Sequence, residues 1–187
     1  RLQVISFLPF KDFSLVHRIC HYFKKDWNFS RKYRLYPKDC LIVPKDCKTL
    51  RTAMQKVESS KGRLTTVILD EGQHHVEPDN ETNCESIKCS VNIFGAWGID
   101  KSKIVVLGGF KIIKNICGNV HLGNMSIRPP ISRKGLHGVM GLSSFTVENV
   151  VLKGNGGDHL DYKHGVFVDG AANHSIVARC KNVQVSQ

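Results

Sequence analysis

The sequence predicts a mainly β fold, a parallel β-helix in which successive turns of the chain stack on one another. Two observations predict it. Apolar or small residues surround Asn124, Asn149 and Asn182 at positions −4, −2, +1 and +3. A second element, His137-Gly138-Val139, recurs 27 residues later as His164-Gly165-Val166. Two elements that repeat in the same order favour a solenoid over an antiparallel β-sandwich with accidental spacing.

Each asparagine frame indicates two short strands that meet at a bend. Apolar residues two apart mark a strand with one buried face, and the phase slips by one residue at the asparagine. Asparagine tolerates the left-handed conformation, and its amide can bond neighbouring backbone. The frames therefore predict an asparagine ladder between rows of inward side chains. These inward residues are Val120, Leu122, Met125 and Ile127, then Phe145, Val147, Val150 and Leu152, then Ala178, Cys180, Val183 and Val185.

The spacing of the frames agrees with a coil. The asparagines lie 25 and 33 residues apart (149 − 124 and 182 − 149), whereas one β-helical turn takes about 20–25 residues. The second interval therefore needs a loop insertion, which we place at residues 169–174 because of their turn chemistry.

The region before the frames predicts shorter elements. Strands are expected at 41–44 and 67–69, followed by a glycine turn at 71–74, then strands at 90–94, 104–107 and 110–113 around a loop at 97–100. Thr49 can cap a helix that Gly62 ends. The apolar positions of that helix are Leu50, Ala53, Met54 and Val57.

This order of strand, capped helix, strand and glycine turn resembles the start of pectin-lyase-like right-handed β-helices. The resemblance implies a right-handed coil whose open N-terminal end is covered by the helix. The domain expected from it is residues 37–187, and we expect further turns to follow Gln187 in a longer protein, since a strand is predicted within two residues of that end.

Residues 7–27 resemble the second half of an F-box. The matching residues are Leu8, Pro9, Lys11, Asp12, Leu15, Val16, Cys20, Phe23 and Trp27. The resemblance implies docking to a Skp1-type adaptor of a ubiquitin ligase, with residues 1–36 as an F-box-like helical segment and linker. The alternative is a short amphipathic helix packed against the β-helix. The adaptor-binding candidates are Leu8, Pro9, Phe13, Leu15, Val16, Ile19, Phe23 and Trp27.

Charge is concentrated at the start of the chain. Residues 1–63 hold 15 Lys and Arg against 5 Asp and Glu, whereas residues 64–187 hold 12 against 11. A basic segment can contact nucleic acid or an acidic partner, and the alternative is a solvated surface.

The cysteines favour an intracellular protein, cytoplasmic or nuclear. Seven cysteines are an odd number without a regular framework, which fits reduced, buried thiols. Bridges Cys40–Cys47 and Cys84–Cys89 are the alternative. No stretch reaches the length of a membrane span, and no secretory apolar region opens the chain.

Catalytic signals are weak. Asp158 and Asp161 lie three apart in a glycine-rich loop, and Lys163 or His164 could serve as a base. No paired-aspartate motif, phosphate loop or nucleotide fingerprint occurs, so we expect no cofactor. Metal binding is not expected, because His74 and His75 are adjacent on a probable strand and should point to opposite faces.

Together these signals predict a binding or scaffold module, the substrate-recognition part of an F-box-type ubiquitin-ligase adaptor. The alternative is a polysaccharide lyase or hydrolase of the pectin-lyase-like fold. The substrate or protein partner is not readable from the sequence.

Overall fold

The computed structural model describes residues 39–76, 84–114, 116, 118–128, 136–153, 162–168 and 176–186. The F-box-like segment 1–36 lies outside these residues. The elements are β1 (Cys40–Val43), α4 (Leu50–Ser59), β2 (Thr66–Leu69), β3 (Gly72–His75), β4 (Cys84–Ile87), β5 (Val91–Gly95), the 3₁₀ helix η1 (Lys101–Lys103), β6 (Ile104–Leu107), β7 (Gly109–Ile112), β8 (Val120–Arg128), β9 (Leu136–Gly141), β10 (Phe145–Lys153), β11 (Tyr162–Val168), β12 (Ala178–Lys181) and β13 (Gln184–Ser186).

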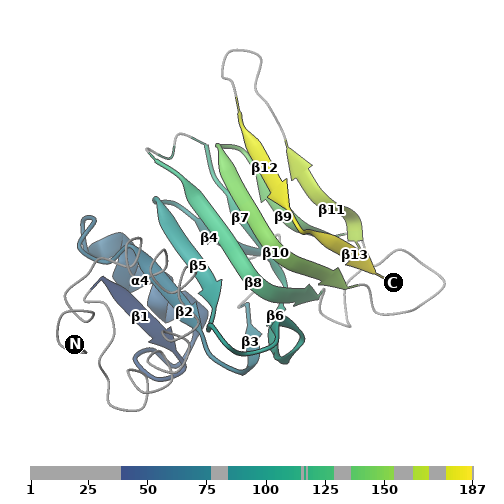
Figure 1. Cartoon of the computed structure of the whole chain (residues 1–187). Helices are drawn as coiled ribbons and strands as arrows, with labels where there is room; N and C mark the ends of the chain where they lie inside the picture. Colours follow the sequence, from purple (N-terminus) through teal and green to yellow (C-terminus); the bar gives the residue numbers. More distant parts are fainter. Residues whose placement is uncertain are drawn as a thin grey trace.

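The strands form two parallel sheets. Sheet A has the order β1-β2-β5-β8-β10-β12, with β13 beside β10 and with β6 joining β3 to β8. Sheet B has the order β11-β9-β7-β4 and lies behind sheet A in Figure 1. All strand pairings among the described residues are parallel. The mainly β, parallel character predicted from the sequence is confirmed.

The chain returns to the same strand positions in the same order. It passes from β2 through β3 to β4, and then from β5 through β6 to β7. In the next two circuits, one long strand of sheet A, first β8 and then β10, takes the place of two short ones. The first part of β8 pairs with β5 and its last part pairs with β6. Sheet B receives β9 and β11 in turn. The two copies of the His-Gly-Val element pair in register, His164 with His137 and Val166 with Val139.

The asparagines occupy the bends. Asn124, Asn149 and Asn182 have φ angles of 54°, 57° and 52°, the left-handed conformation that asparagine tolerates. Asn149 Nδ2 donates to Asn124 Oδ1 over 2.9 Å, and Asn124 Nδ2 donates to the carbonyl oxygen of Gly95 over 3.2 Å. Lys101 Nζ donates to Asn149 Oδ1 over 3.1 Å. The amides therefore link three successive circuits.

The inward rows are buried in the first two frames and mostly exposed in the third. All eight predicted residues around Asn124 and Asn149 belong to one apolar core. The third row keeps the predicted inward register and Val183 is half-buried against the core, but Ala178, Cys180 and Val185 are exposed, Val185 to 72%. These residues keep the register, as Cys180 pairs with Val147, but among the described strands none packs beyond β12 and β13.

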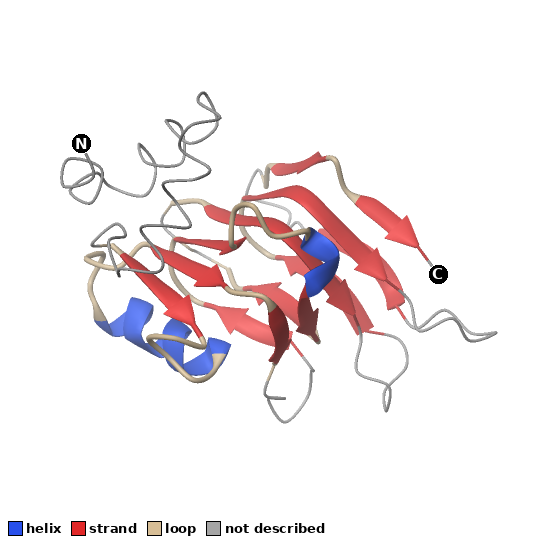
Figure 2. Ribbon diagram, turned by 60° about the horizontal axis from the view of Figure 1, so that its bottom comes forward, coloured by secondary structure: helices blue, strands red, loops and turns tan. Residues whose placement is uncertain are grey.

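Helix α4 covers the opposite end of the sheets (Figure 2). Its four predicted apolar residues are buried in the core. Thr49 Oγ1 accepts the backbone N–H of Thr52 over 3.2 Å, as a capping threonine does. Arg51 reaches Glu85 on β4, with 3.7 Å between Nε and Oε2. The helix ends at Ser59, three residues before Gly62, and the chain leaves the helical conformation at Lys61 and Gly62, whose φ angles are 52° and 83°.

Two strands depart from the sequence prediction. Residues 72–75 form β3, which pairs with β6, whereas a glycine turn was expected at 71–74 and a strand only around His74 and His75. Strand β4 was not predicted, and it pairs with β7. Both pairings join segments far apart in the sequence, which local patterns do not report. Among the described residues, no helix has the length and hydropathy needed to cross a membrane.

The described cysteines Cys40, Cys47, Cys84, Cys89 and Cys180 are not disulfide-bonded. The alternative bridges Cys40–Cys47 and Cys84–Cys89 are therefore not formed in this structure.

Candidate functional site

The outward side chains of sheet A form two rows across its strands, on the face turned away from sheet B. In each frame the inward residues stand at positions −4 and −2, so positions −3 and −1 point outward. The first row is Thr66, Asn92, His121, Thr146 and Arg179, and the second row is Ile68, Phe94, Gly123, Glu148 and Lys181. We call the part of these rows on β5, β8, β10 and β12 the outer strip.

Glu148 is the centre of the outer strip. Its Oε1 accepts from Lys181 Nζ over 3.2 Å, and its Oε2 lies 3.5 Å from His121 Nε2. The Glu148 side chain is 16% exposed and that of Lys181 69% exposed. The carboxylate is thus fixed between two side chains from the neighbouring strands, while the ammonium group remains open to a ligand.

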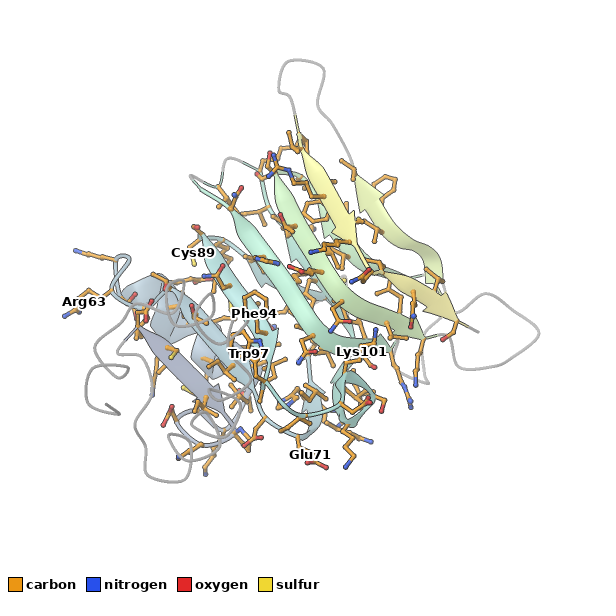
Figure 3. The ribbon with its side chains drawn as sticks, in the orientation of Figure 1. Arg63, Glu71, Cys89, Phe94, Trp97 and Lys101 are labelled. Carbon is orange, nitrogen blue, oxygen red and sulfur yellow. The ribbon has the colours of Figure 1, made fainter. Side chains whose placement is uncertain are left out.

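An aromatic group adjoins this cluster. Phe94 contacts His121 edge to face, with ring centroids 4.7 Å apart, and stacks on Trp97 at 5.7 Å. Figure 3 shows Phe94 and Trp97 side by side on this face. Gly123 makes room for the phenyl ring, since a Cβ there would lie 2.6 Å from Phe94 Cε1. Apolar rings, a carboxylate and cations therefore lie on adjacent strands of one rigid sheet.

Most site residues predicted from the sequence fall elsewhere. Asp158 and Asp161 lie outside the described residues, so their grouping with His164 stays a prediction. The backbone of His164 belongs to β11 at the edge of sheet B, whereas the outer strip is on sheet A. The adaptor-binding candidates between Leu8 and Trp27 also lie outside the described residues.

The sequence reasoning missed Phe94, His121 and Glu148. A signal for two of them was present, because the asparagine frame that predicts inward residues also predicts outward residues at −3 and −1. His121 and Glu148 occupy these positions. Their contact across β8 and β10 follows from the register. The neighbourhood of Phe94 could not be predicted, since its strand has no asparagine frame.

A cavity lies at the end of the sheets that α4 covers. A cavity of about 190 Å³ is bounded by the turn between β1 and α4 and by β3. His74 lines it and is buried, with Nε2 2.8 Å from the carbonyl oxygen of Asp70. Burial lowers the pKa of His74 below its usual 6.5. His75 is exposed and also borders this cavity.

Metal ligands do not cluster in the described part of the chain, where no three His, Cys, Asp or Glu side chains gather around one point. The outer strip offers a carboxylate beside an imidazole, a pair suited to hydrogen bonding and to proton transfer. Among the outward positions of β5, β8, β10 and β12 described here, Glu148 carries the only carboxylate.

Comparison with protein-family models, with curated proteins and with solved structures found no match to this chain.

Proposed function

We propose that this chain is a binding module in which the circuits form a right-handed parallel β-helix and the outer strip holds a protein partner. The observation that carries the proposal is the arrangement around Glu148. Hydrogen-bonded, packed side chains on a sheet present a preorganised surface, which lowers the entropic cost of binding. Parallel circuits that return in register support the β-helix.

The charges of the strip favour an acidic partner. Arg179 and Lys181 are exposed on β12, against the single carboxylate of Glu148 in the described strip. Glu148 offsets one of these cations, so the strip keeps a positive balance. Phe94 and Trp97 add an apolar contact at the other side. We therefore expect a segment that combines carboxylates with an aromatic or aliphatic side chain.

A peptide titration tests this surface. The probe is a fluorescein-labelled peptide of alternating Glu and Phe residues, measured by anisotropy at two salt concentrations. The double variant Arg179→Glu/Lys181→Glu should weaken binding about tenfold or more, because it reverses both charges that face the peptide. The matched control is Lys45→Glu/Lys88→Glu, which changes the net charge equally at exposed positions away from the strip. Equal losses in both double variants would show nonspecific attraction and contradict the proposal.

The same proposal gives the N-terminal segment a separate role. Its F-box-like residues 7–27 connect the module to a Skp1-type adaptor of a ubiquitin ligase, which places the protein inside the cell. A pull-down with purified Skp1-type adaptor tests this part. Wild-type chain should be retained and the Leu15→Asp variant should not, because the resemblance places Leu15 among the docking residues. If the wild-type chain is not retained, the adaptor role is contradicted, and the proposal for the outer strip is unaffected.

One observation favours a second candidate, a polysaccharide lyase. The His121–Glu148 pair, with 3.5 Å between Nε2 and Oε2, can accept and return a proton. Hydrolysis in the usual manner uses two carboxylates about 5–9.5 Å apart, and the described strip offers one. The assay is cleavage of pectate and alginate with and without calcium. Turnover that is lost in Glu148→Gln would favour this enzyme over the binding module.

A further inference from the structure

The cavity beside α4 lies at the free edge of β3. In the next circuit, the strand position of β3 is taken by β6, and the two strands pair with each other. In the circuit before, the chain leaves β1 through a turn and enters α4 instead of forming a strand. Among the described strands, β3 therefore has a partner on one side only. The turn residues Pro44, Lys48 and Thr49 border the cavity of about 190 Å³ on the other side.

His74 of β3 faces the inside of the stack. It pairs in register with Val106, which belongs to the main core, and paired residues of neighbouring strands lie on the same face. His74 is 6% exposed and lines the cavity. Since the carbonyl oxygen of Asp70 can only accept, Nε2 carries the proton of their 2.8 Å hydrogen bond. In the neutral ring Nδ1 is then an acceptor, and it has no hydrogen-bond partner among the described residues.

The start of α4 supplies donors to the same cavity. Lys48, Thr49 and Leu50 line it, and their backbone N–H groups have no acceptor among the described residues. The N-terminus of a helix carries a partial positive charge, and its first N–H groups point beyond the helix. The first turn of α4 holds no acidic residue, and Arg51 in that turn is engaged with Glu85 on β4. The donors at this end therefore have no built-in anion.

The charged side chains around the cavity leave it positive. Glu71 borders it, and its Oε1 lies 3.6 Å from Lys103 Nζ, which offsets its charge. The carboxylates of Asp70 and Asp46 each accept a backbone N–H, at 2.7 Å and 2.8 Å. Lys48 is exposed and has no ion-pair partner among the described residues. Its ammonium group is therefore available to a ligand.

We propose that the cavity binds a small oxyanion, a phosphate, sulfate or carboxylate group, between Lys48, the N–H groups at the start of α4 and the ring of His74. Pockets for drug-sized ligands have about 300–1,000 Å³, so a cavity of about 190 Å³ suits a ligand of few atoms. The neutral ring turns an acceptor toward the anion, and the ring has to take up a proton before Nδ1 can donate to it. Binding is therefore coupled to protonation of His74.

This coupling makes the affinity depend on pH. Burial holds the pKa of His74 below 6.5, and the charges of Asp70 and His75 act on it in opposite directions. A bound anion favours the charged ring and raises this pKa. The affinity should therefore rise as the pH falls, because more of the bound protein carries a protonated His74.

An NMR titration of the full chain with sodium sulfate tests the site, with sodium chloride to hold the ionic strength constant. Sulfate has no proton that titrates between pH 5.5 and 7.5, so a pH dependence comes from the protein. The backbone amide signals of residues 48–50 should shift and saturate. The affinity should be about threefold or more higher at pH 5.5 than at pH 7.5, and the ring signals of His74 should report a pKa that sulfate raises.

Parallel titrations with inorganic phosphate and with sodium acetate distinguish the sources of the oxyanion. Saturation of the same amide signals with either one supports the site and identifies the group that it prefers.

Two pairs of variants locate the binding. Lys48→Glu should weaken sulfate binding about tenfold, because it reverses the charge beside the cavity. Lys88→Glu is its matched control, since it makes the same change at an exposed position between β4 and β5. His74→Gln keeps a hydrogen-bonding side chain that cannot take up a proton, so it should remove the pH dependence of the affinity. His75→Gln at the neighbouring exposed position should keep that dependence.

Four results overturn the proposal. The shifts at residues 48–50 fail to saturate with all three anions, or Lys48→Glu and Lys88→Glu lose affinity equally, or His75→Gln and not His74→Gln removes the pH dependence, or sulfate leaves the pKa of His74 unchanged. The last measurement uses the wild-type chain, so it decides even if His74→Gln does not fold. The inference does not rest on the outer strip or on the adaptor role, and its failure leaves both proposals unaffected.

Discussion

Asn149 combines a left-handed backbone with two side-chain hydrogen bonds, to Asn124 and from Lys101. Two substitutions of Asn149 separate the contribution of the backbone conformation from that of the side-chain hydrogen bonds. Asn149→Gly keeps the backbone conformation and loses the bonds, whereas Asn149→Ala also adds the left-handed penalty. We expect Ala to lower the free energy of unfolding by about 1–2 kcal/mol more than Gly. Urea denaturation of both variants measures this difference, and equal stabilities would contradict it.

Gly95 lies against the bend at Asn124. A Cβ at this position would overlap the carbonyl oxygen of Asn124 and lie 2.8 Å from Ile104 Cδ1. Gly95→Ala should therefore destabilise the protein by about 3 kcal/mol or more, since backbone cannot move aside as a flexible side chain does.

Gly62 is the control for that substitution. Its φ is +83° and a Cβ would meet nothing within 4 Å, so Gly62→Ala should cost only the conformational penalty of about 1–2 kcal/mol. Thermal unfolding of both variants gives the comparison. A smaller loss for Gly95→Ala than for Gly62→Ala would show that the bend is not closely packed.

His74 makes the stability depend on pH. Burial lowers its pKa in the folded protein below 6.5. Between pH 6.5 and this lower pKa, His74 is therefore mostly protonated in the unfolded chain and mostly neutral in the folded chain. The free energy of unfolding should fall as the pH drops from 6.5 to the folded pKa, and this contribution should then stay constant. His74→Gln should reduce the fall, measured by urea denaturation at pH 7.5 and 5.5. The exposed His75→Gln is the control and should behave as the wild-type chain does.

At the scale of elements, sequence patterns predicted α4 and the asparagine bends well, because their determinants are local. Thr49, an apolar stripe and two inward rows are contained in short stretches. Strand β4 and the first half of β3 escaped prediction, because their pairing partners, β7 and β6, lie more than 20 residues further along the chain. The outer strip escaped for the same reason, since only the register brings His121 beside Glu148.

The cap of α4 gives a prediction for this element. Thr49→Ala removes the acceptor for the Thr52 N–H and should lower the free energy of unfolding by about 1 kcal/mol. Thr49→Ser keeps a hydroxyl at the same place and should retain most of the stability. Chemical denaturation compares the two, and a Ser variant as unstable as the Ala variant would show that the hydroxyl does not cap the helix.

At the scale of the molecule, stability should decrease from the interior of the stack toward β12 and β13. Their residues are exposed, whereas β8 is paired on both sides and carries buried residues from both sheet positions. In stacked repeats an outer unit lacks one neighbour. Hydrogen exchange of the full chain should therefore show faster exchange in 178–186 than in 120–128. Equal protection would contradict this gradient.

The sequence by itself determined where the chain bends, which residues face inward in the two central frames, and where the capping helix begins. These features depend on side chains within a few positions of each other, so a local pattern specifies them. The tertiary structure decided that most of the third frame is exposed, that Phe94 lies against His121, and that outward residues of β1 and β2 are buried. Each of these depends on which distant part of the chain packs against the strand. The residue pattern along one strand does not specify which residues of another strand will lie beside it.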